Sequence, residues 1–361
     1  MRRDKALLLA RTAAANAAGA ALGVVESIYL RSLGLPPDLV GAYLGISTVL
    51  SAISSYVLSA LADAYGRKRL ALASNVFPVL GLLMLYAGLA AGILLIYIGP
   101  SGAYSALYAE VAEDPDRDWS HISIVSVAAN AAGSLLPTGL PMRGVLVAGL
   151  AIYAAGIAAL AAVRERYRGS GKVILDVASK GTLARLSSAA IIGLGAGIVI
   201  PMLPLWLYTV YGVGPGPIGV LLSAQSALMV LAFWMAPKLS SAMGRLRTIV
   251  VTQAAGVALI SAFPLSPTFT VAAAIWAARS VAMNMANPLY YALVNELVPE
   301  EERGRANSAL QLLDSVPRSV GPYVTGTLMN MGNLRLPFYL TAALYGSATA
   351  TLYFLMRNRV R

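Results

Sequence analysis

Four ionisable residues lie well inside long apolar runs of this sequence, away from the ends, namely Glu26, Arg279, Asp314 and Arg318. An ionisable side chain inside a membrane span costs roughly 2.5 to 3.5 kcal/mol on insertion scales, so such residues are candidates for function. Glu26 can take up and release a proton, because a carboxyl group withdrawn from water holds its proton more tightly. A fixed ion pair with an arginine on another helix is the equally weighted alternative. Asp314 and Arg318 stand four residues apart and can neutralise each other on a helix, with a role of Asp314 in proton coupling as the alternative.

A polar and aromatic stripe adds candidates for binding a solute. Its members share one face of the helix predicted over residues 269–294, because they follow one another at spacings of three or four: Trp276, Arg279, Met283, Asn287 and Tyr290. The pattern indicates a cavity wall rather than a lipid-facing surface. Further cavity candidates, for which helix packing or a place at the membrane interface is the alternative, are Tyr104, Tyr108, Asn130, Trp206, Gln225 and Arg318.

The elements that position these residues are predicted to be membrane-spanning helices. Of the 361 residues, 58% are hydrophobic and only 12% are charged, whereas a soluble domain carries about 25% charged residues. Runs of about 20 apolar residues recur along the whole chain, which is the length that crosses a bilayer. We predict twelve spans, over residues 8–30, 38–60, 70–91, 93–112, 121–140, 144–163, 187–211, 217–236, 248–265, 269–294, 306–330 and 335–356.

The basic residues indicate how these spans are oriented. The formal net charge is +11, and most of the 27 lysines and arginines fall in the termini and in every second gap between the apolar runs. The positive-inside rule therefore predicts that both termini are cytoplasmic. We expect the apolar run after Met1 to be a retained first helix rather than a cleaved signal peptide, because it continues for a full span.

Several kinds of chemistry have no support in the composition. The chain has no cysteine, and its one histidine, His121, has no acidic cluster at metal-ligand spacing. We therefore expect no metal, no cofactor and no enzymatic activity. The basic residues report membrane topology, so nucleic acid is not an expected partner. Gly169, Ser170, Gly171 and Lys172 resemble the end of a phosphate-binding loop only superficially, and we expect no nucleotide.

The chain is predicted to consist of two halves. The longest break, residues 164–186, is basic and contains glycines, which is typical of a linker between bundles at 1–163 and 187–361. An internal repeat supports this division, because a set of residues recurs at a constant offset of 178 positions: Gly34, Gly41, Leu61, Gly66 and Arg67 match Gly212, Gly219, Leu239, Gly244 and Arg245. Repeats of six spans each predict two similar bundles around a shared central cavity.

A loop motif after the second span resembles the signature of the major facilitator superfamily (MFS). The signature reads G-x-L-A-D-R-x-G-R-K-x, and the matching residues are Leu61, Ala62, Asp63, Gly66, Arg67 and Lys68. Ser59 replaces the first glycine of the signature, and Ala64 replaces a basic residue. In the second half Ser241 stands at the aspartate position, so we expect an asymmetric gate.

The resemblance implies an all-α membrane fold of twelve helices, in which the first, fourth, seventh and tenth helices line the cavity. It also implies that Arg67 pairs with an acidic residue ending the fourth helix, for which Glu110 is the candidate. Asp63 ends a helix, where the macrodipole disfavours an anion, so it needs a partner. Gly66 would allow the tight turn, and these contacts would close the cytoplasmic side. Alternatively, the basic residues of the motif only fix topology.

The function expected from the resemblance is secondary transport of a small solute by alternating access. Proton-coupled efflux of small organic or drug-like molecules is the leading hypothesis, although only Gly321, Pro322 and Gly326 echo the motif of drug/proton antiporters, and they lie in the wrong helix. A symporter or uniporter of a sugar or organic anion is the alternative, and a transporter-like receptor is a further one. We expect a monomer in the plasma membrane, with lipid, a small solute and protons as its partners.

Overall fold

The computed structural model describes residues 2–112, 115–165, 167, 169–173, 187–285, 287 and 312–356. These residues form α-helices and short 3-10 helices, with no strand in the described part. The first half contains α1 (Arg2–Ser32), α2 (Pro37–Tyr65), α3 (Arg67–Ser74), α4 (Val76–Tyr86), η1 (Ala90–Gly92), α5 (Ile93–Ile96), α6 (Ser101–Ala109), α7 (Pro115–Ser134), η2 (Leu136–Thr138) and α8 (Met142–Ala162). The second half contains α10 (Ser187–Val199), α11 (Leu203–Tyr211), α12 (Pro215–Met243), α13 (Arg245–Ala262), η3 (Phe263–Leu265), α14 (Phe269–Asn284), α17 (Gly321–Asn330) and α18 (Leu336–Met356). Residues 312–318 are also helical.

Eight helical segments of the described chain are long and apolar enough to cross a membrane. They are Arg3–Ser32, Pro37–Tyr65, Arg67–Tyr86, Ala90–Ala109, Met142–Ala162, Ala190–Tyr211, Pro215–Met243 and Arg245–Leu265. All eight coincide with spans predicted from the sequence. The predicted spans at 121–140 and 335–356 correspond to α7 and α18, which are not among the eight, and the predicted spans at 269–294 and 306–330 extend beyond the described residues. The count of twelve crossings therefore stays a prediction.

Some candidate spans are broken where the sequence predicted one continuous helix. The segment predicted over 93–112 is divided into α5 and α6, and Pro100 stands directly before α6. The segment over 187–211 is divided into α10 and α11, with Pro204 in the first turn of α11. Proline has no N–H to donate and is tolerated at the start of a helix, so each proline fits the beginning of a new helical segment.

The internal repeat is visible in the backbone. Gly34 and its partner Gly212 both have positive φ angles, 93° and 65°, and so do Gly66 and Gly244, at 117° and 87°. The first pair precedes α2 and α12, which are each 29 residues long. The second pair follows the same two helices. Glycine adopts such angles without strain, so in both repeats a glycine with positive φ stands before and after the 29-residue helix.

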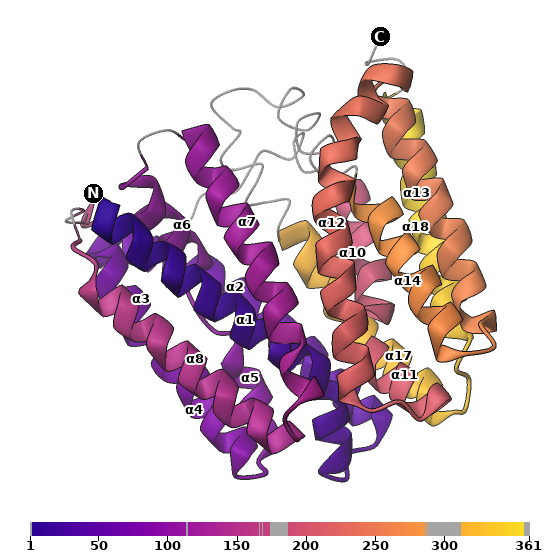
Figure 1. Ribbon diagram of the computed structural model, residues 1–361, viewed down its shortest axis with the longest axis horizontal. Helices are drawn as coiled ribbons and strands as arrows, with labels where there is room; N and C mark the ends of the chain where they lie inside the picture. The colour runs from indigo at the N-terminus through magenta and orange to yellow at the C-terminus, as the bar shows by residue number, and fades with distance from the viewer. Residues whose placement is uncertain are drawn as a thin grey trace. The chain divides into compact units, whose positions relative to one another are not determined.

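The chain forms two compact units, of which the first contains Met1–Leu35, Ile46–Leu175 and Gly214–Ser223. Within it, α1 packs against both α7 and α8 (Figure 1). α1 and α7 approach so closely that a Cβ atom on Gly133 of α7 would overlap the backbone of Ala17 on α1. A Cβ atom on Gly156 of α8 would likewise lie only 2.9 Å from the Cβ of Ala14 on α1. Glycines thus allow the helices to pack at short range.

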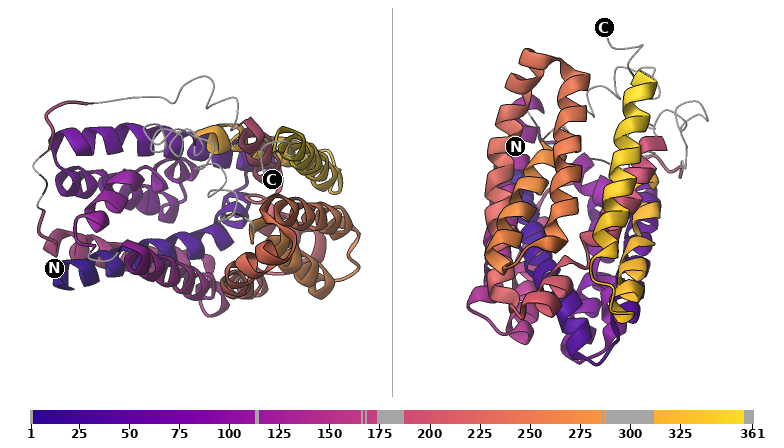
Figure 2. Two further views of the ribbon diagram at one scale, coloured as in Figure 1. Left: turned by 90° about the horizontal axis from the view of Figure 1, so that it is seen from above. Right: turned by 90° about the vertical axis from the view of Figure 1, so that its right-hand side faces the viewer.

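The second unit contains Pro36–Gly45, Asp176–Val213 and Ala224–Arg361. Within it, α13 runs beside α14 and α18 (Figure 2), and α10 contacts α17 and α18. Gly193 and Gly197 of α10 lie so close to the backbone of Asp314 and Arg318 that a Cβ atom would overlap it. They are therefore helix-packing positions. Aromatic side chains fill part of this unit, with ring centroids 4.7 to 5.4 Å apart among Trp206, Phe263, Trp276 and Phe338.

The starts of α2 and α12 are each grouped with the other unit than the rest of their helix. In the second unit, Gly41 of α2 lies against the backbone of Pro322. In the first unit, Gly219 of α12 lies against the backbone of Ser134. Gly41 and Gly219 are partners in the sequence repeat, so the repeated glycines serve the same kind of close backbone contact.

Candidate gating site at the end of α2

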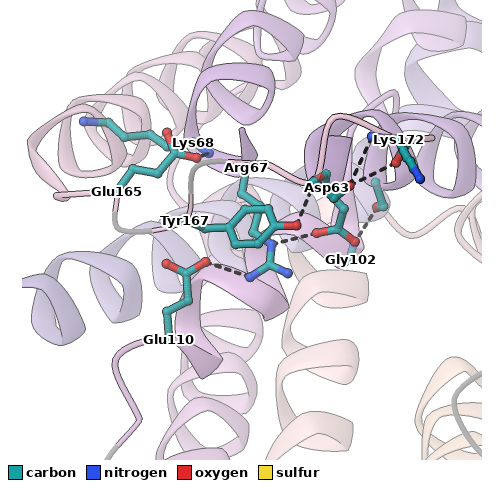
Figure 3. Close-up of polar contacts among 10 residues, drawn as sticks. Asp63, Arg67, Lys68, Gly102, Glu110, Glu165, Tyr167 and Lys172 are labelled. Carbon is teal, nitrogen blue, oxygen red and sulfur yellow. Dashed lines mark hydrogen bonds and ion pairs between the residues drawn. The ribbon is translucent and has the colours of Figure 1, made fainter. Parts of the chain in front are cut away.

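Arg67 stands at the centre of a charged cluster in the first unit. Its Nε donates to Oδ1 of Asp63 at 2.7 Å, and its Nη1 donates to Oε1 of Glu110, also at 2.7 Å. The ring of Tyr167 lies over the guanidinium, 4.1 Å from its centroid to Cζ. Figure 3 shows the arginine held between the two carboxylates with the tyrosine beside it. Charge-assisted hydrogen bonds of this length are among the stronger polar contacts in proteins.

The local sequence explains why these groups meet. Asp63 is in the last turn of α2 and Arg67 is the first residue of α3, with Gly66 between the helices at φ 117°. A side chain at that angle would be strained, and a Cβ there would also lie 3.3 Å from the carboxylate of Glu165. Gly66 therefore allows the chain to turn while Asp63 and Arg67 keep a spacing of four residues.

A segment after α8 covers the end of α2, and we call it the strap (Glu165, Tyr167, Gly169, Ser170 and Gly171). The hydroxyl of Tyr167 and the N–H of Ser170 both donate to the carbonyl of Asp63 at 2.9 Å, and the N–H of Gly171 donates to the carbonyl of Ala64 at 3.1 Å. The last carbonyls of a helix have no partner within the helix, so the strap acts as its C-terminal cap. Gly169 approaches the carbonyl of Ala64 so closely that a Cβ would overlap it.

Lys68 contacts different groups from its neighbour Arg67. Its Nζ donates to the carbonyls of Ala161 and Val163 at 2.7 and 2.6 Å, at the end of α8, and its backbone N–H donates to Oε1 of Glu165 at 2.9 Å. A cation at a helix C-terminus is favoured by the macrodipole. Lys68 therefore fastens α3 to α8 and the strap.

Ser59, which departs from the family signature, contacts a glycine on a neighbouring helix. Ser59, which replaces the first glycine, accepts a hydrogen bond from the backbone N–H of Gly102 on α6 at 3.1 Å. A Cβ on Gly102 would lie 2.8 Å from Oγ of Ser59. The glycine at this helix contact is thus on α6 rather than on α2.

Glu26 is bound by a tyrosine and not by a base. Its Oε2 accepts a hydrogen bond from the hydroxyl of Tyr97, which follows α5, at 2.6 Å. Among the described residues no lysine or arginine forms an ion pair with Glu26. The fixed ion pair that the sequence left open is not present in this part of the chain.

The predicted stripe is partly buried within the second unit. Trp276, Arg279 and Met283 are buried on α14. Trp276 donates from Nε1 to the side-chain oxygen of Gln225 at 2.7 Å, and Nη2 of Arg279 donates to the hydroxyl of Tyr345 at 2.7 Å. Asn287 is exposed and donates to the side chain of Asn284 at 3.2 Å. Tyr290 lies outside the described residues.

Other predicted cavity residues have mainly structural contacts. Trp206 is in the aromatic core of the second unit and donates from Nε1 to the carbonyl of Leu334 at 2.8 Å. Tyr108 is buried and donates to the carbonyl of Asp118 at 3.2 Å. Asn130 is half-buried on α7.

Asp314 and Arg318 form the local pair that their spacing allows. Nε and Nη2 of Arg318 donate to the two carboxylate oxygens at 2.8 to 3.0 Å. This pairing lowers the cost of placing either charge in an apolar span.

Sequence reasoning missed three contributors to these clusters. Tyr167 and Glu165 lie in the segment predicted to be a linker, and Arg11 is not among the candidate residues chosen from the sequence. The structure places Arg11 against Tyr104 inside the first unit, with Nη2 3.2 Å from the hydroxyl. The one available signal was that Arg11 falls inside the first apolar run rather than before it.

Comparison with known proteins finds one family match. Residues 186–361 match the family model of the Major Facilitator Superfamily. The second half of the chain therefore matches this superfamily. The resemblance seen in the loop motif at residues 59–69 is thereby confirmed from the other half of the chain. Comparison with curated protein sequences finds no match.

Solved structures of this superfamily's fold cover almost the whole chain. The nucleoside transporter NupG has a TM-score of 0.79 at 13% identity, covering 98% of this chain and 99% of that one. A bacterial homologue of the iron transporter ferroportin in its inward-facing state has a TM-score of 0.75 at 16% identity, covering 98% of each chain. An auto-inhibited peptide transporter of the POT family has a TM-score of 0.81 at 11% identity, covering 99% of this chain and 97% of that one.

At these identities the structural likeness shows the fold alone. Together with the family match, it supports membrane transport of a small solute by a multi-pass, all-helical MFS protein.

Proposed function

We propose that this MFS protein is a proton-coupled secondary transporter that exports small organic molecules by alternating access. The observation that carries the proposal is the contact between Glu26 and Tyr97 inside the membrane-spanning region. The carboxylate accepts a 2.6 Å hydrogen bond from the tyrosine hydroxyl and has no basic partner in the described part of the chain. A carboxyl group without a fixed counter-charge changes the net charge of its site when it gains or loses a proton. Such a group can couple a proton to a solute.

The proposal includes the architecture expected from the sequence. Twelve spans form a bundle at residues 1–163 and a second bundle at 187–361, joined by a cytoplasmic linker at 164–186. Both termini are cytoplasmic, and the protein acts as a monomer in the plasma membrane. The paired backbone angles at Gly34 and Gly212 and at Gly66 and Gly244 support two related bundles.

The cluster around Arg67 is proposed to close the cytoplasmic side. Arg67 connects the end of α2 to the residue that follows α6, through Asp63 and Glu110. It is also covered by Tyr167 from the strap. Helices that tilt apart during alternating access would separate these groups, so the ion pairs stabilise one conformation relative to the other.

Proton flux in proteoliposomes tests the coupling. Purified protein is reconstituted, a pH gradient is imposed, and cationic drugs, sugars and organic anions are added in turn. We expect solute-dependent proton flux in the wild type and its loss in Glu26→Gln. Tyr97→Phe, which keeps the carboxyl group but removes its hydrogen-bond donor, should retain flux with a shifted pH dependence.

Asp314→Asn serves as the matched control for removal of an acid. Asp314 is already paired with Arg318, so this variant should keep proton flux if Glu26 is the coupling group. Flux that survives Glu26→Gln but is lost in Asp314→Asn would move the coupling role to Asp314. Solute transport without any proton movement would overturn the coupled mechanism.

Transport of an organic anion without protons is the second candidate. Arg279 favours it, because this guanidinium is buried in the second unit and donates to the hydroxyl of Tyr345, with no carboxylate paired to it in the described residues. Uptake of a labelled organic anion in the absence of a pH gradient, lost in Arg279→Gln, would support this candidate over the first.

A further inference from the structure

One arginine that takes no part in the cluster around Arg67 is buried in the first unit. Arg11 is on α1 and only 4% of its surface is exposed. Its Nη2 lies 3.3 Å from Oδ1 of Asn75, 3.2 Å from the hydroxyl of Tyr104 and 3.1 Å from the hydroxyl of Tyr153. The guanidinium carbon also lies 4.7 and 4.8 Å from the centroids of the two tyrosine rings. Three other segments of the unit therefore converge on one cation of α1.

The hydrogen-bonding capacity of Arg11 is only partly used. Nε and Nη1 are both buried and have no hydrogen-bond partner. Among the described residues no carboxylate forms an ion pair with Arg11, whereas two other cations of the first unit have acidic partners. Lys5 pairs with Asp118, and Arg67 pairs with Asp63 and Glu110. A buried charge without a counter-ion and with unpaired donors is strongly disfavoured.

The neighbouring polar groups do not correct this imbalance. The hydroxyl of Tyr153 donates to Oδ1 of Asn75 at 2.7 Å, and the hydroxyl of Tyr104 lies 3.4 Å from both that oxygen and the carbonyl of Ala71. The amide nitrogen of Asn75 is committed to the carbonyl of Ala71 at 2.7 Å. The cluster thus has more donors than acceptors and carries a positive charge. Water would supply an acceptor, but only an anion supplies an acceptor and also neutralises the charge.

We propose that Arg11, Tyr104 and Tyr153 form an anion-binding site within the first unit. Its ligand is a compact anion, either a halide such as chloride or the carboxylate group of a small solute. The ring faces hold the guanidinium in place, and its Nε and Nη1 donate to the anion. The low exposure of Arg11 disfavours a lipid headgroup, whose acyl chains would have to accompany it.

Thermal unfolding of the purified full-length protein in an uncharged detergent tests the site. Sodium chloride and sodium acetate are titrated separately, and sodium isethionate keeps the ionic strength constant. A ligand that binds only the folded state raises the midpoint temperature in a saturable way. We expect saturation with at least one of the two anions, and the arm that responds identifies a halide or a carboxylate as the ligand. Because no gradient or solute is involved, this result is independent of proton coupling.

Arg11→Gln should abolish the saturable response, whereas Arg318→Gln should keep it, because Arg318 is already neutralised by Asp314. Tyr153→Phe keeps the charge and removes one hydroxyl, so it should weaken the apparent anion affinity about three- to tenfold even if Arg11→Gln does not fold. The proposal is overturned if neither anion gives a saturable response in the wild type, or if Arg11→Gln and Tyr153→Phe both respond as the wild type does.

Discussion

Glu110→Gln should destabilise the protein more than Asp63→Asn, although both carboxylates bind the same arginine. The side chains of Arg67 and Glu110 are 19% and 16% exposed, whereas that of Asp63 is 51% exposed. Breaking a fully buried ion pair costs about 3–5 kcal/mol, and an exposed pair contributes about 0.2–1 kcal/mol. The pair of Arg67 with Glu110 lies between these limits, and we expect a cost of about 1.5–2 kcal/mol. Solvent screens the pair of Arg67 with Asp63, for which we expect about 0.5 kcal/mol.

Double-mutant cycles on thermal unfolding measure these two couplings separately. One cycle combines Glu110→Gln with Arg67→Gln, and the other combines Asp63→Asn with Arg67→Gln. The midpoint temperature of a domain of 150–250 residues shifts by about 2–4 °C per kcal/mol, so the two single variants should be distinguishable. Equal coupling energies, or a larger one for Asp63, would refute the burial argument.

The small stability cost expected for Asp63→Asn allows an effect on gating to be distinguished from an effect on stability. Since Asp63→Asn should cost little stability, a loss of transport in this variant with normal membrane insertion would report the gate itself. Unchanged transport in Asp63→Asn would contradict the proposed role of this residue in closing the cytoplasmic side.

Two further predictions concern glycines and their matched controls. Gly169→Ala should release the strap from α2 and speed proteolysis of the segment at 164–173, because the added Cβ would overlap the backbone of α2. The control is Gly171→Ala, which has a similar positive φ but open space around it and should have the smaller effect. Gly133→Ala should destabilise the first unit by about 1–3 kcal/mol, because it overpacks the contact between α7 and α1, and chemical unfolding should show Gly139→Ala to be nearly neutral.

Much of the secondary structure and part of the site could be predicted because they depend on local sequence. Apolar runs of about 20 residues predict spanning helices, since the bilayer leaves the backbone no other partner than itself. The pairing of Asp314 with Arg318 follows from a spacing of four residues on one helix. The contact of Arg67 with Glu110 is not local, and it was expected only because the motif at residues 61–68 resembles that of a known family.

The tertiary structure alone decided which distant groups surround the charges. Arg11 meets Asn75, Tyr104 and Tyr153, which lie 64, 93 and 142 positions along the chain, and no periodicity connects residues at such separations. The contacts of the strap could not be predicted from the sequence either. Tyr167 lies in the linker, 100 positions after Arg67, and reaches it only because α8 returns the chain to the end of α2. The sequence by itself determined that the chain crosses a membrane, where its helices lie and which family it resembles. Which buried cation has a carboxylate and which lacks one depends on helix packing, because the electrostatic balance of a buried group is set by its neighbours in space.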